Sequence, residues 1–111
     1  MYKLRFSKLY HSDLDECYNY ISNKLENPTA ADRLIIEAKK KLIEVKNNPA
    51  HRPLVNDEYL ANLGYRLKVV KNYILFYIIG DDNKHLKIVR FLYSKRDWIN
   101  ILKEKTIEEM M

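Results

Sequence analysis

The spacing of apolar residues in the first half of the chain most constrains its fold. Two stretches carry apolar side chains three and four residues apart, and Asn27-Pro28 separates them. Such spacing predicts amphipathic helices, and asparagine followed by proline is a typical helix start. Because the connection is short, we expect the two helices to pack as an antiparallel hairpin. The first stripe is Leu14, Cys17, Tyr18, Ile21 and Leu25, and the second is Ala31, Leu34, Ile35, Ala38, Leu42 and Val45.

Alternating polar and apolar residues predict four β-strands around this hairpin. At the N-terminus, Tyr2, Leu4 and Phe6 alternate with Lys3 and Arg5, which is typical of a strand with one buried and one wet face. Three further strands are predicted at residues 65–70, 73–79 and 86–93, separated by short turns. We expect these three to form an antiparallel meander. In the last of them, alternation predicts one shared face for Leu86, Ile88, Arg90 and Leu92.

The remaining segments complete the predicted fold. Residues 49–62 show no clear period and predict a long surface loop, and Trp98, Ile101 and Leu102 indicate a short amphipathic C-terminal helix. A length of 111 residues suits one domain. We therefore predict a single α+β domain over residues 1–111, with the order β-α-α-β-β-β(-α) and an antiparallel sheet packed on the helical hairpin. Residues 1–94 would form its core, and residues 95–111 its C-terminal helix and tail.

The residue content excludes several classes of protein. Cys17 is the only cysteine, so neither an internal disulfide nor a thiolate metal cluster can form, and the three histidines lack metal-ligand spacing. The two glycines, Gly64 and Gly80, begin no phosphate-binding fingerprint. We therefore expect no metal and no cofactor. The N-terminus lacks a signal peptide's apolar run, and no stretch approaches the ~18 apolar residues of a membrane span, so we expect a cytoplasmic protein without a membrane partner.

Positive charge is the main pointer to a binding surface. Twenty Lys and Arg against fifteen Asp and Glu give a net charge of +5 and a pI near 9.2, which favours anionic partners. One face of the sheet is predicted to receive the hairpin and the other to carry alternating cations and aromatics. Such a face suits RNA, because guanidinium groups pair with phosphate while rings stack on unpaired bases. The candidate target-binding residues are Arg66, Lys68, Lys71, Tyr73, Arg90, Tyr93, Lys95, Arg96 and Trp98.

Two interpretations of these residues stay open. An arginine cluster could stabilise the charge that develops on a phosphate during attack by a ribose 2′-hydroxyl, in place of a metal. Alternatively, the strand lysines and arginines are a solvated sheet face and the tyrosines are half-buried packing.

Several short segments along the chain carry a further signal. They are Lys3-Leu-Arg-Phe-Ser7 with Asp13-Leu14 after it, Ala31-Asp-Arg-Leu34, Asn48-Pro49, Gly64-Tyr-Arg-Leu-Lys-Val69, Asn72-Tyr-Ile-Leu-Phe-Tyr77 and Ile88-Val-Arg-Phe-Leu-Tyr-Ser-Lys-Arg-Asp-Trp98. None is specific alone. Their order and spacing together resemble the RelE/ParE toxins of bacterial type II toxin–antitoxin modules, also called plasmid stabilisation proteins.

This resemblance implies a toxin that arrests bacterial growth, with one of two targets. RelE-like members are metal-independent endoribonucleases that cleave ribosome-bound mRNA, and Arg66, Lys68 and Arg96 match their basic catalytic positions. ParE-like members inhibit DNA gyrase. Ile74 and Leu102 stand where RelE-like enzymes place an arginine and a tyrosine, which slightly favours the gyrase branch.

The resemblance also implies partners. A cognate antitoxin would wrap the toxin with an added helix or strand and neutralise it, and operator DNA would be reached only through the antitoxin. A third hypothesis is a degenerate toxin that folds and binds its antitoxin but has no efficient target.

Overall fold

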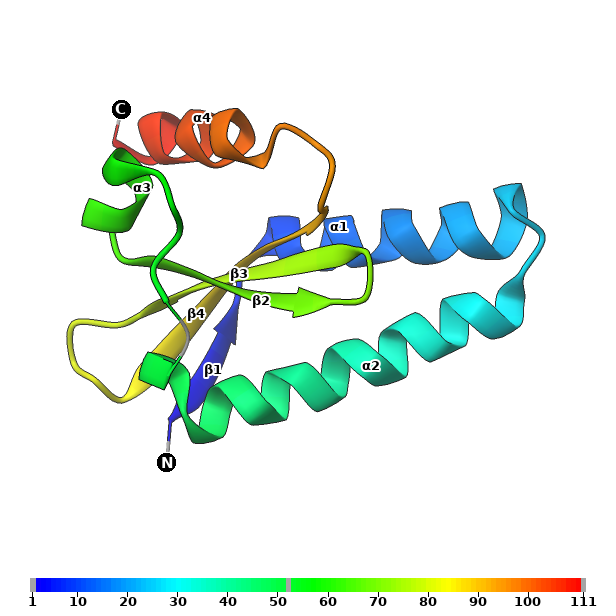
Figure 1. Ribbon diagram of the computed structural model, residues 1–111, viewed down its shortest axis with the longest axis horizontal. Coiled ribbons are helices and arrows are strands. Elements are labelled where there is room, and N and C mark those ends of the chain that lie inside the picture. Colours follow the sequence, from blue (N-terminus) through cyan, green and yellow to red (C-terminus); the bar gives the residue numbers. More distant parts are fainter. Residues whose placement is uncertain (1, 52, 111) are drawn as a thin grey trace.

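The computed structural model describes residues 2–51 and 53–110, with side chains described through Glu104 (Figure 1). It confirms the predicted α+β class. In chain order the elements are β1 (Lys3–Phe6), α1 (Lys8–Asn19), the π-helical turn η1 (Tyr20–Lys24), α2 (Pro28–Asn47), the 3-10 turn η2 (Pro49–His51), α3 (Glu58–Asn62), β2 (Tyr65–Val70), β3 (Tyr73–Ile79), β4 (His85–Tyr93) and α4 (Trp98–Met110).

The four strands form one sheet in the order β1-β4-β3-β2. Strands β2, β3 and β4 make the predicted antiparallel meander. Strand β1, however, pairs with β4 in parallel, so the sheet is mixed and not antiparallel throughout as the sequence had suggested. Alternation of residues marks a strand and its faces but carries no information about the direction of its neighbour.

The helical hairpin covers one face of the sheet, as predicted. Helices α1 and α2 lie against the strands in Figure 1, and the Tyr18 hydroxyl donates a 2.9 Å hydrogen bond from α1 to Asp32 on α2. Side chains from both helices and from all three meander strands form this first core. Its buried members are Tyr10, Leu34, Ala38, Leu42, Val45, Val70, Leu75, Tyr77, Leu86, Ile88 and Phe91.

The opposite face of the sheet is covered over β2, β3 and the second half of β4, which corrects the expectation of an open cationic face. Helices α3 and α4 pack there with Val55, and the buried residues Leu60 and Leu102 come from these two helices. The segment 49–62 is therefore not a plain loop, since it contains η2 and α3. Asp57 caps α3 by accepting from the Leu60 backbone N–H at 3.1 Å. A helix of five residues is too short to show a helical period in the sequence.

The hairpin extends past the end of the sheet at the η1 end (Figure 1). The start of α1 is tied to the middle of β4, because the Ser7 N–H donates to the Ile88 carbonyl at 3.0 Å. From there α1 and η1 continue for 12 and 5 residues, about 25 Å at 1.5 Å per residue. Strand β4 ends at Tyr93, about 17 Å further on at 3.3 Å per residue. The underside of the projecting end is thus left without a strand beneath it.

None of the described helices combines the length and apolar character that a membrane span requires.

Candidate functional site

A groove of about 860 Å³ lies between the projecting end of the hairpin and the end of the sheet. Residues of α1, η1 and α2 form one wall, and the β2–β3 turn, the ends of β3 and β4, and the following turn form the other. We call this the hairpin groove. Its apolar lining includes Ile21, Leu25, Leu34 and Phe91. It gathers four of the predicted target-binding residues: Lys71, Tyr73, Tyr93 and Arg96.

Aromatic rings make the floor of the hairpin groove. Tyr73 stacks on Phe91 with centroids 5.2 Å apart and rings 10° from parallel, and Tyr93 meets Tyr73 edge-on at 5.6 Å. Tyr73 also shares a hydrogen bond with Cys17 of α1. Burial raises the pKa of Tyr73 to about 12 and that of the Cys17 thiol to about 11. Both groups are therefore neutral near pH 7, and Cys17 is a poor nucleophile there.

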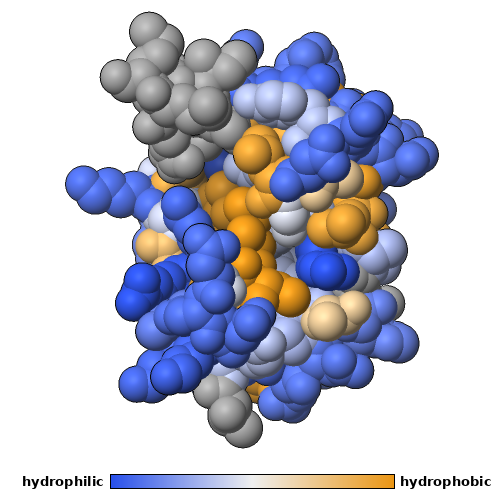
Figure 2. Space-filling model, turned by 90° about the vertical axis from the view of Figure 1, so that its left-hand side faces the viewer, coloured by the Kyte–Doolittle hydropathy of each residue, from blue (hydrophilic) through white to orange (hydrophobic). Residues whose placement is uncertain are grey.

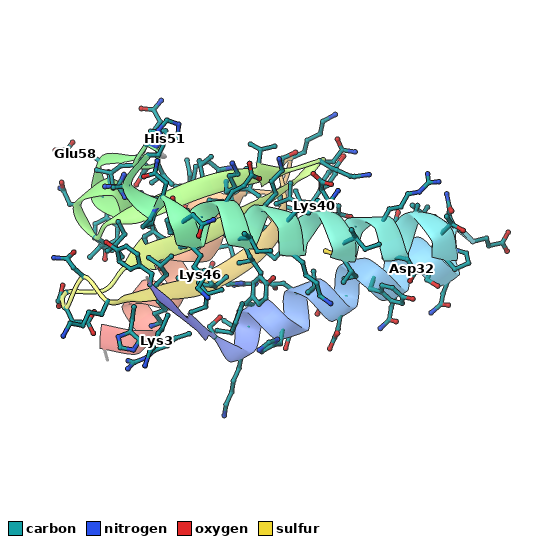
Figure 3. The ribbon with its side chains drawn as sticks, turned by 90° about the horizontal axis from the view of Figure 1, so that it is seen from below. Lys3, Asp32, Lys40, Lys46, His51 and Glu58 are labelled. Atoms are coloured by element: carbon teal, nitrogen blue, oxygen red, sulfur yellow. The ribbon has the colours of Figure 1, made fainter. Side chains whose placement is uncertain are left out.

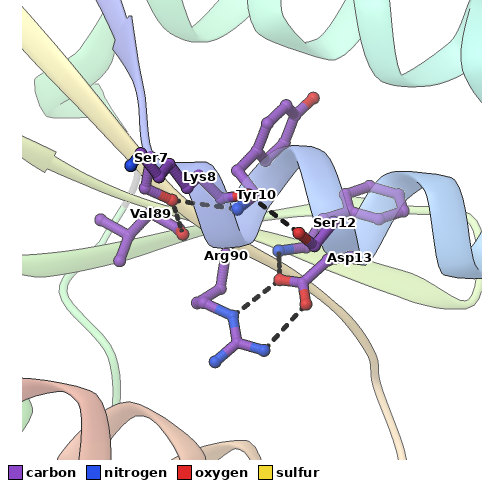
Figure 4. Close-up of polar contacts among 8 residues, drawn as sticks. Ser7, Lys8, Tyr10, Ser12, Asp13, Val89 and Arg90 are labelled. Atoms are coloured by element: carbon purple, nitrogen blue, oxygen red, sulfur yellow. Dashed lines mark hydrogen bonds and ion pairs between the residues drawn. The ribbon is translucent and has the colours of Figure 1, made fainter.

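Arg90 is engaged within the fold by Asp13 of α1 (Figure 4). Its Nε and Nη2 donate to the two Asp13 carboxylate oxygens at 2.7 and 2.8 Å. The same carboxylate accepts from the Phe91 backbone N–H at 3.0 Å. The side chains of Arg90 and Asp13 are only 12% and 6% exposed. Because β1 ends opposite Ile88, Asp13 takes over as the hydrogen-bond partner of the β4 edge. Arg90 thus has a structural partner and does not line the hairpin groove.

The basic residues of β2 also lie outside the hairpin groove. Arg66 and Lys68 face the hairpin side of the sheet, since their partners across β3 are Tyr77 and Leu75. Lys68 is buried, and its Nζ lies 3.6 Å from Glu44 Oε1 on α2. It lines a separate groove of about 570 Å³ along β2, which Lys71 shares. The three residues predicted to be catalytic, Arg66, Lys68 and Arg96, therefore do not line one cavity.

The last two predicted residues differ in their surroundings. Trp98 is half-buried at the start of α4 and contacts the Phe76 ring with centroids 5.1 Å apart. Lys95 is exposed in the turn that follows β4. The two positions that depart from the RelE-like pattern, Ile74 and Leu102, are both buried in the second core.

Sequence reasoning missed the hairpin wall of this groove. Cys17, Ile21 and Leu25 were identified as an apolar helix face, and a helix face is normally core. Leu25 is 55% exposed instead, because it lies where the hairpin has passed the sheet. The apolar face of this helix is visible in the sequence. Apolar periodicity alone does not reveal that the helix extends beyond the end of the sheet.

The groove combines an apolar floor with charges of both signs at its rim. Lys71 and Arg96 are exposed on the sheet side, and Glu16 is exposed on the hairpin side. No histidine is among the described residues that line it, and the side chains that the structure describes include no group of three His, Cys, Asp or Glu that could hold a metal ion. Such a surface suits an amphipathic polypeptide segment better than acid–base chemistry.

Comparison with known proteins gives a family match over most of the chain. Residues 4–98 match the model described as the ParE toxin of the type II toxin–antitoxin system parDE. The chain has no match among curated protein sequences.

Solved structures share the fold at low sequence identity. The chromosomal ParDE system of P. aeruginosa is 15% identical with a TM-score of 0.69, covering 86% of this chain and 98% of that one. The RelBE2 toxin–antitoxin complex of Mycobacterium tuberculosis is 18% identical with a TM-score of 0.56, covering 83% and 96%. The isolated RelE toxin of E. coli is 18% identical with a TM-score of 0.56, covering 96% and 99%.

Proposed function

This chain belongs to the ParE toxin family of type II toxin–antitoxin systems, and from that membership we propose that it arrests growth by inhibiting DNA gyrase in the cytoplasm. The family match and the higher TM-score with the ParDE system than with the RelE-type structures both favour this branch. Gyrase inhibition is a protein-binding activity and needs no catalytic group on the toxin itself.

The observation that carries this proposal is the dispersal of the basic residues. Metal-free cleavage of RNA needs cationic groups that converge on one phosphate, where negative charge develops in the transition state. Here Lys68 is buried against Glu44, whereas Arg96 lies in the hairpin groove. Ile74 and Leu102 supply neither a cation nor a proton donor.

A ribosome-dependent endoribonuclease of the RelE type is the second candidate. Lys71 and Arg96 border the groove in which Tyr93 is 38% exposed. A cation pair beside an exposed ring suits a phosphate with a stacked, unpaired base. In this alternative Arg96 contacts the scissile phosphate, and Tyr73, which its raised pKa keeps protonated near pH 7, does not act as a general base.

We further propose that the cognate antitoxin occupies the hairpin groove. The apolar floor would receive the apolar side chains of an antitoxin segment, and Lys71 and Arg96 would pair with its acidic residues. Operator DNA would then be reached only through the antitoxin's own DNA-binding part.

Two assays run side by side test the target. The purified chain is added to a gyrase supercoiling reaction, and mRNA from cells expressing it alone is mapped by primer extension. We expect loss of supercoiling with intact mRNA. Ribosome-dependent cleavage with unaffected gyrase would overturn the proposal in favour of the ribonuclease, and no effect in either assay would indicate a degenerate toxin.

Paired variants locate the acting surface. Arg96→Ala removes an exposed cation of the hairpin groove, and Lys40→Ala removes an exposed cation from α2, outside that groove (Figure 3). We expect Arg96→Ala to weaken gyrase inhibition about tenfold, the effect of one lost charge-assisted contact, and Lys40→Ala to leave it unchanged. Equal effects of the two variants would show that net charge, and not the groove, is responsible.

A further inference from the structure

A second cluster of polar side chains lies on the open part of the sheet face that α3 and α4 partly cover. The parallel register places Lys3 opposite His85 and Arg5 opposite Lys87. Leu4 and Leu86, the residues between them, belong to the hairpin core. Because side chains alternate along a strand, the four basic residues all face away from the hairpin. On this face, two neighbouring cross-strand pairs, Lys3 with His85 and Arg5 with Lys87, therefore consist of basic residues only.

Three of these residues line a pocket of about 460 Å³. Arg5, His85 and Lys87 border it, together with the β3–β4 turn at Gly80 and Asp82. None of its lining residues belongs to the hairpin groove. Like charges placed directly opposite each other in a sheet repel. An anion between them would relieve this repulsion.

Asp82 fixes the orientation of the His85 ring. Its Oδ2 lies 2.6 Å from His85 Nδ1, and its Oδ1 accepts from the backbone N–H groups of Lys84 and His85 at 2.9 and 3.1 Å. The Lys84 N–H, followed by His85, lowers the pKa of Asp82 to about 2, so the carboxylate stays ionised near neutral pH. Gly80 permits this close turn, because a Cβ there would lie 3.1 Å from the His85 carbonyl oxygen.

The second nitrogen of His85 is aimed at Arg5. His85 Nε2 lies 3.3 Å from Arg5 Nη2. With a neutral ring, Nδ1–H donates to Asp82 and Nε2 accepts from the guanidinium. After protonation, Nε2–H and the guanidinium both become donors pointing into the same space. The pair then needs an acceptor with negative charge.

We propose that Arg5, protonated His85 and Lys87 bind a phosphate group in this pocket. Phosphate oxygens accept charge-assisted hydrogen bonds from guanidinium, imidazolium and ammonium groups. The charged groups around His85 are Asp82, which balances the imidazolium, Asp81, which lines the pocket and opposes an anion, and Lys3, Arg5, Lys84 and Lys87. Among the described residues around the pocket, the cations outnumber the carboxylates. This inference is independent of the toxin's target.

Nuclear magnetic resonance tests the site on the full chain. The ¹⁵N-labelled protein is titrated with inorganic phosphate near pH 6, with sodium chloride at matched ionic strength as the reference. We expect saturable shifts of the amides of β1 and residues 80–87. Equal shifts with chloride, or shifts spread over the whole surface, would overturn the proposal.

Three variants separate the contributions of the side chains. Arg5→Gln removes an exposed cation of the pocket, and we expect phosphate affinity to fall about tenfold. His85→Gln removes a second basic group of the pocket and is also expected to weaken phosphate binding. Lys39→Gln, an exposed cation on α2, is the matched control and should leave phosphate binding unchanged. If Arg5→Gln and Lys39→Gln have the same effect, binding is non-specific and the site is refuted.

A single-stranded oligonucleotide, used in the same titration, identifies the source of the phosphate. Tighter binding than inorganic phosphate, lost in Arg5→Gln and decreasing with salt, would assign a nucleic-acid phosphodiester. Binding of inorganic phosphate alone, with no Arg5-dependent binding of the oligonucleotide, would assign a small phosphorylated molecule.

Discussion

At the scale of single residues, environment decides what each charge can do. The sequence groups Arg90 and Lys68 with Arg96 because all three are basic and lie on or just after the predicted strands. In the structure Arg90 is paired with Asp13, and Lys68 is buried beside Glu44. Only Arg96 of the three is exposed. Alternation predicts the face on which a side chain lies, but the element that covers that face comes from elsewhere in the chain.

Asp13 is expected to be the most important polar residue for stability. Asp13→Ala would leave Arg90 as an unpaired, mostly buried charge and remove the partner of the Phe91 N–H. We expect the free energy of unfolding in urea to fall by about 3 kcal/mol. Asp15→Ala, an exposed carboxylate on the same helix, is the control and should change it by less than about 0.5 kcal/mol.

A double variant checks that the loss comes from this ion pair. Asp13→Ala with Arg90→Ala removes both charges, so it should be less destabilising than the sum of the two single changes. Strict additivity of the single effects would contradict the pairing.

Cys17 is expected to react slowly with alkylating reagents. Burial raises its pKa from 9.0 to about 11, so near pH 7.5 the thiolate fraction is about 100-fold below that of an ordinary cysteine. The rate of iodoacetamide modification, followed by mass spectrometry, should rise about tenfold per pH unit and level off only near pH 11. The denatured chain serves as the reference. A plateau below about pH 9 in the folded protein would contradict this assignment.

At the scale of elements, the sequence predicts where helices and strands begin and end, but not how the strands pair. The bounds of α2, β2 and β3 agree with the prediction, because Asn27-Pro28, Asn48-Pro49 and the short turns mark them in the sequence itself. The direction of β1 depends on which strand becomes its neighbour. A register shift in β4 also places Ile88 opposite Tyr77 but Arg90 opposite Phe76, on the other face. The predicted shared face of Ile88 and Arg90 is therefore wrong.

The start of α2 gives a test at this scale. The Asn27 side chain accepts from the Ala30 backbone N–H at 3.1 Å and so caps the helix. Asn27→Ala should lower the free energy of unfolding by about 1 kcal/mol. Asn19→Ala is the matched control, because Asn19 precedes η1 without a capping hydrogen bond. The same loss from both variants, measured by urea denaturation, would show that the cap is not the cause.

At the scale of the whole molecule, the sheet is the shared wall of two apolar cores. The hairpin closes one, and α3 and α4 close the other. Exposed apolar residues remain around the second core, among them Leu54, Tyr59 and Leu63.

Figure 2 shows the side of the molecule on which α3 and the β3–β4 turn lie. Apolar side chains on this side gather in a strip between hydrophilic borders. Leu102 of α4 is buried in the second core, and Trp98 and Ile101 pack against it.

Leu102 tests the contribution of α4. It is fully buried in the second core, and Leu102→Ala should reduce the free energy of unfolding by about 3 kcal/mol through lost burial and the cavity left behind. Ile36→Ala, at a site 55% exposed on α2, should cost less than about 1 kcal/mol. A small effect at Leu102 would mean that α4 is docked only loosely.

The parallel pairing of β1 with β4 also has a consequence for how the toxin is made. Arg5 and His85 lie side by side although they are 80 residues apart in the chain. During synthesis the first strand therefore emerges from the ribosome long before its partner, by about 4–16 s at 5–20 residues per second. The sheet and both cores can close only once nearly the whole chain has been translated. A nascent copy therefore cannot present the complete fold until its own translation is almost finished.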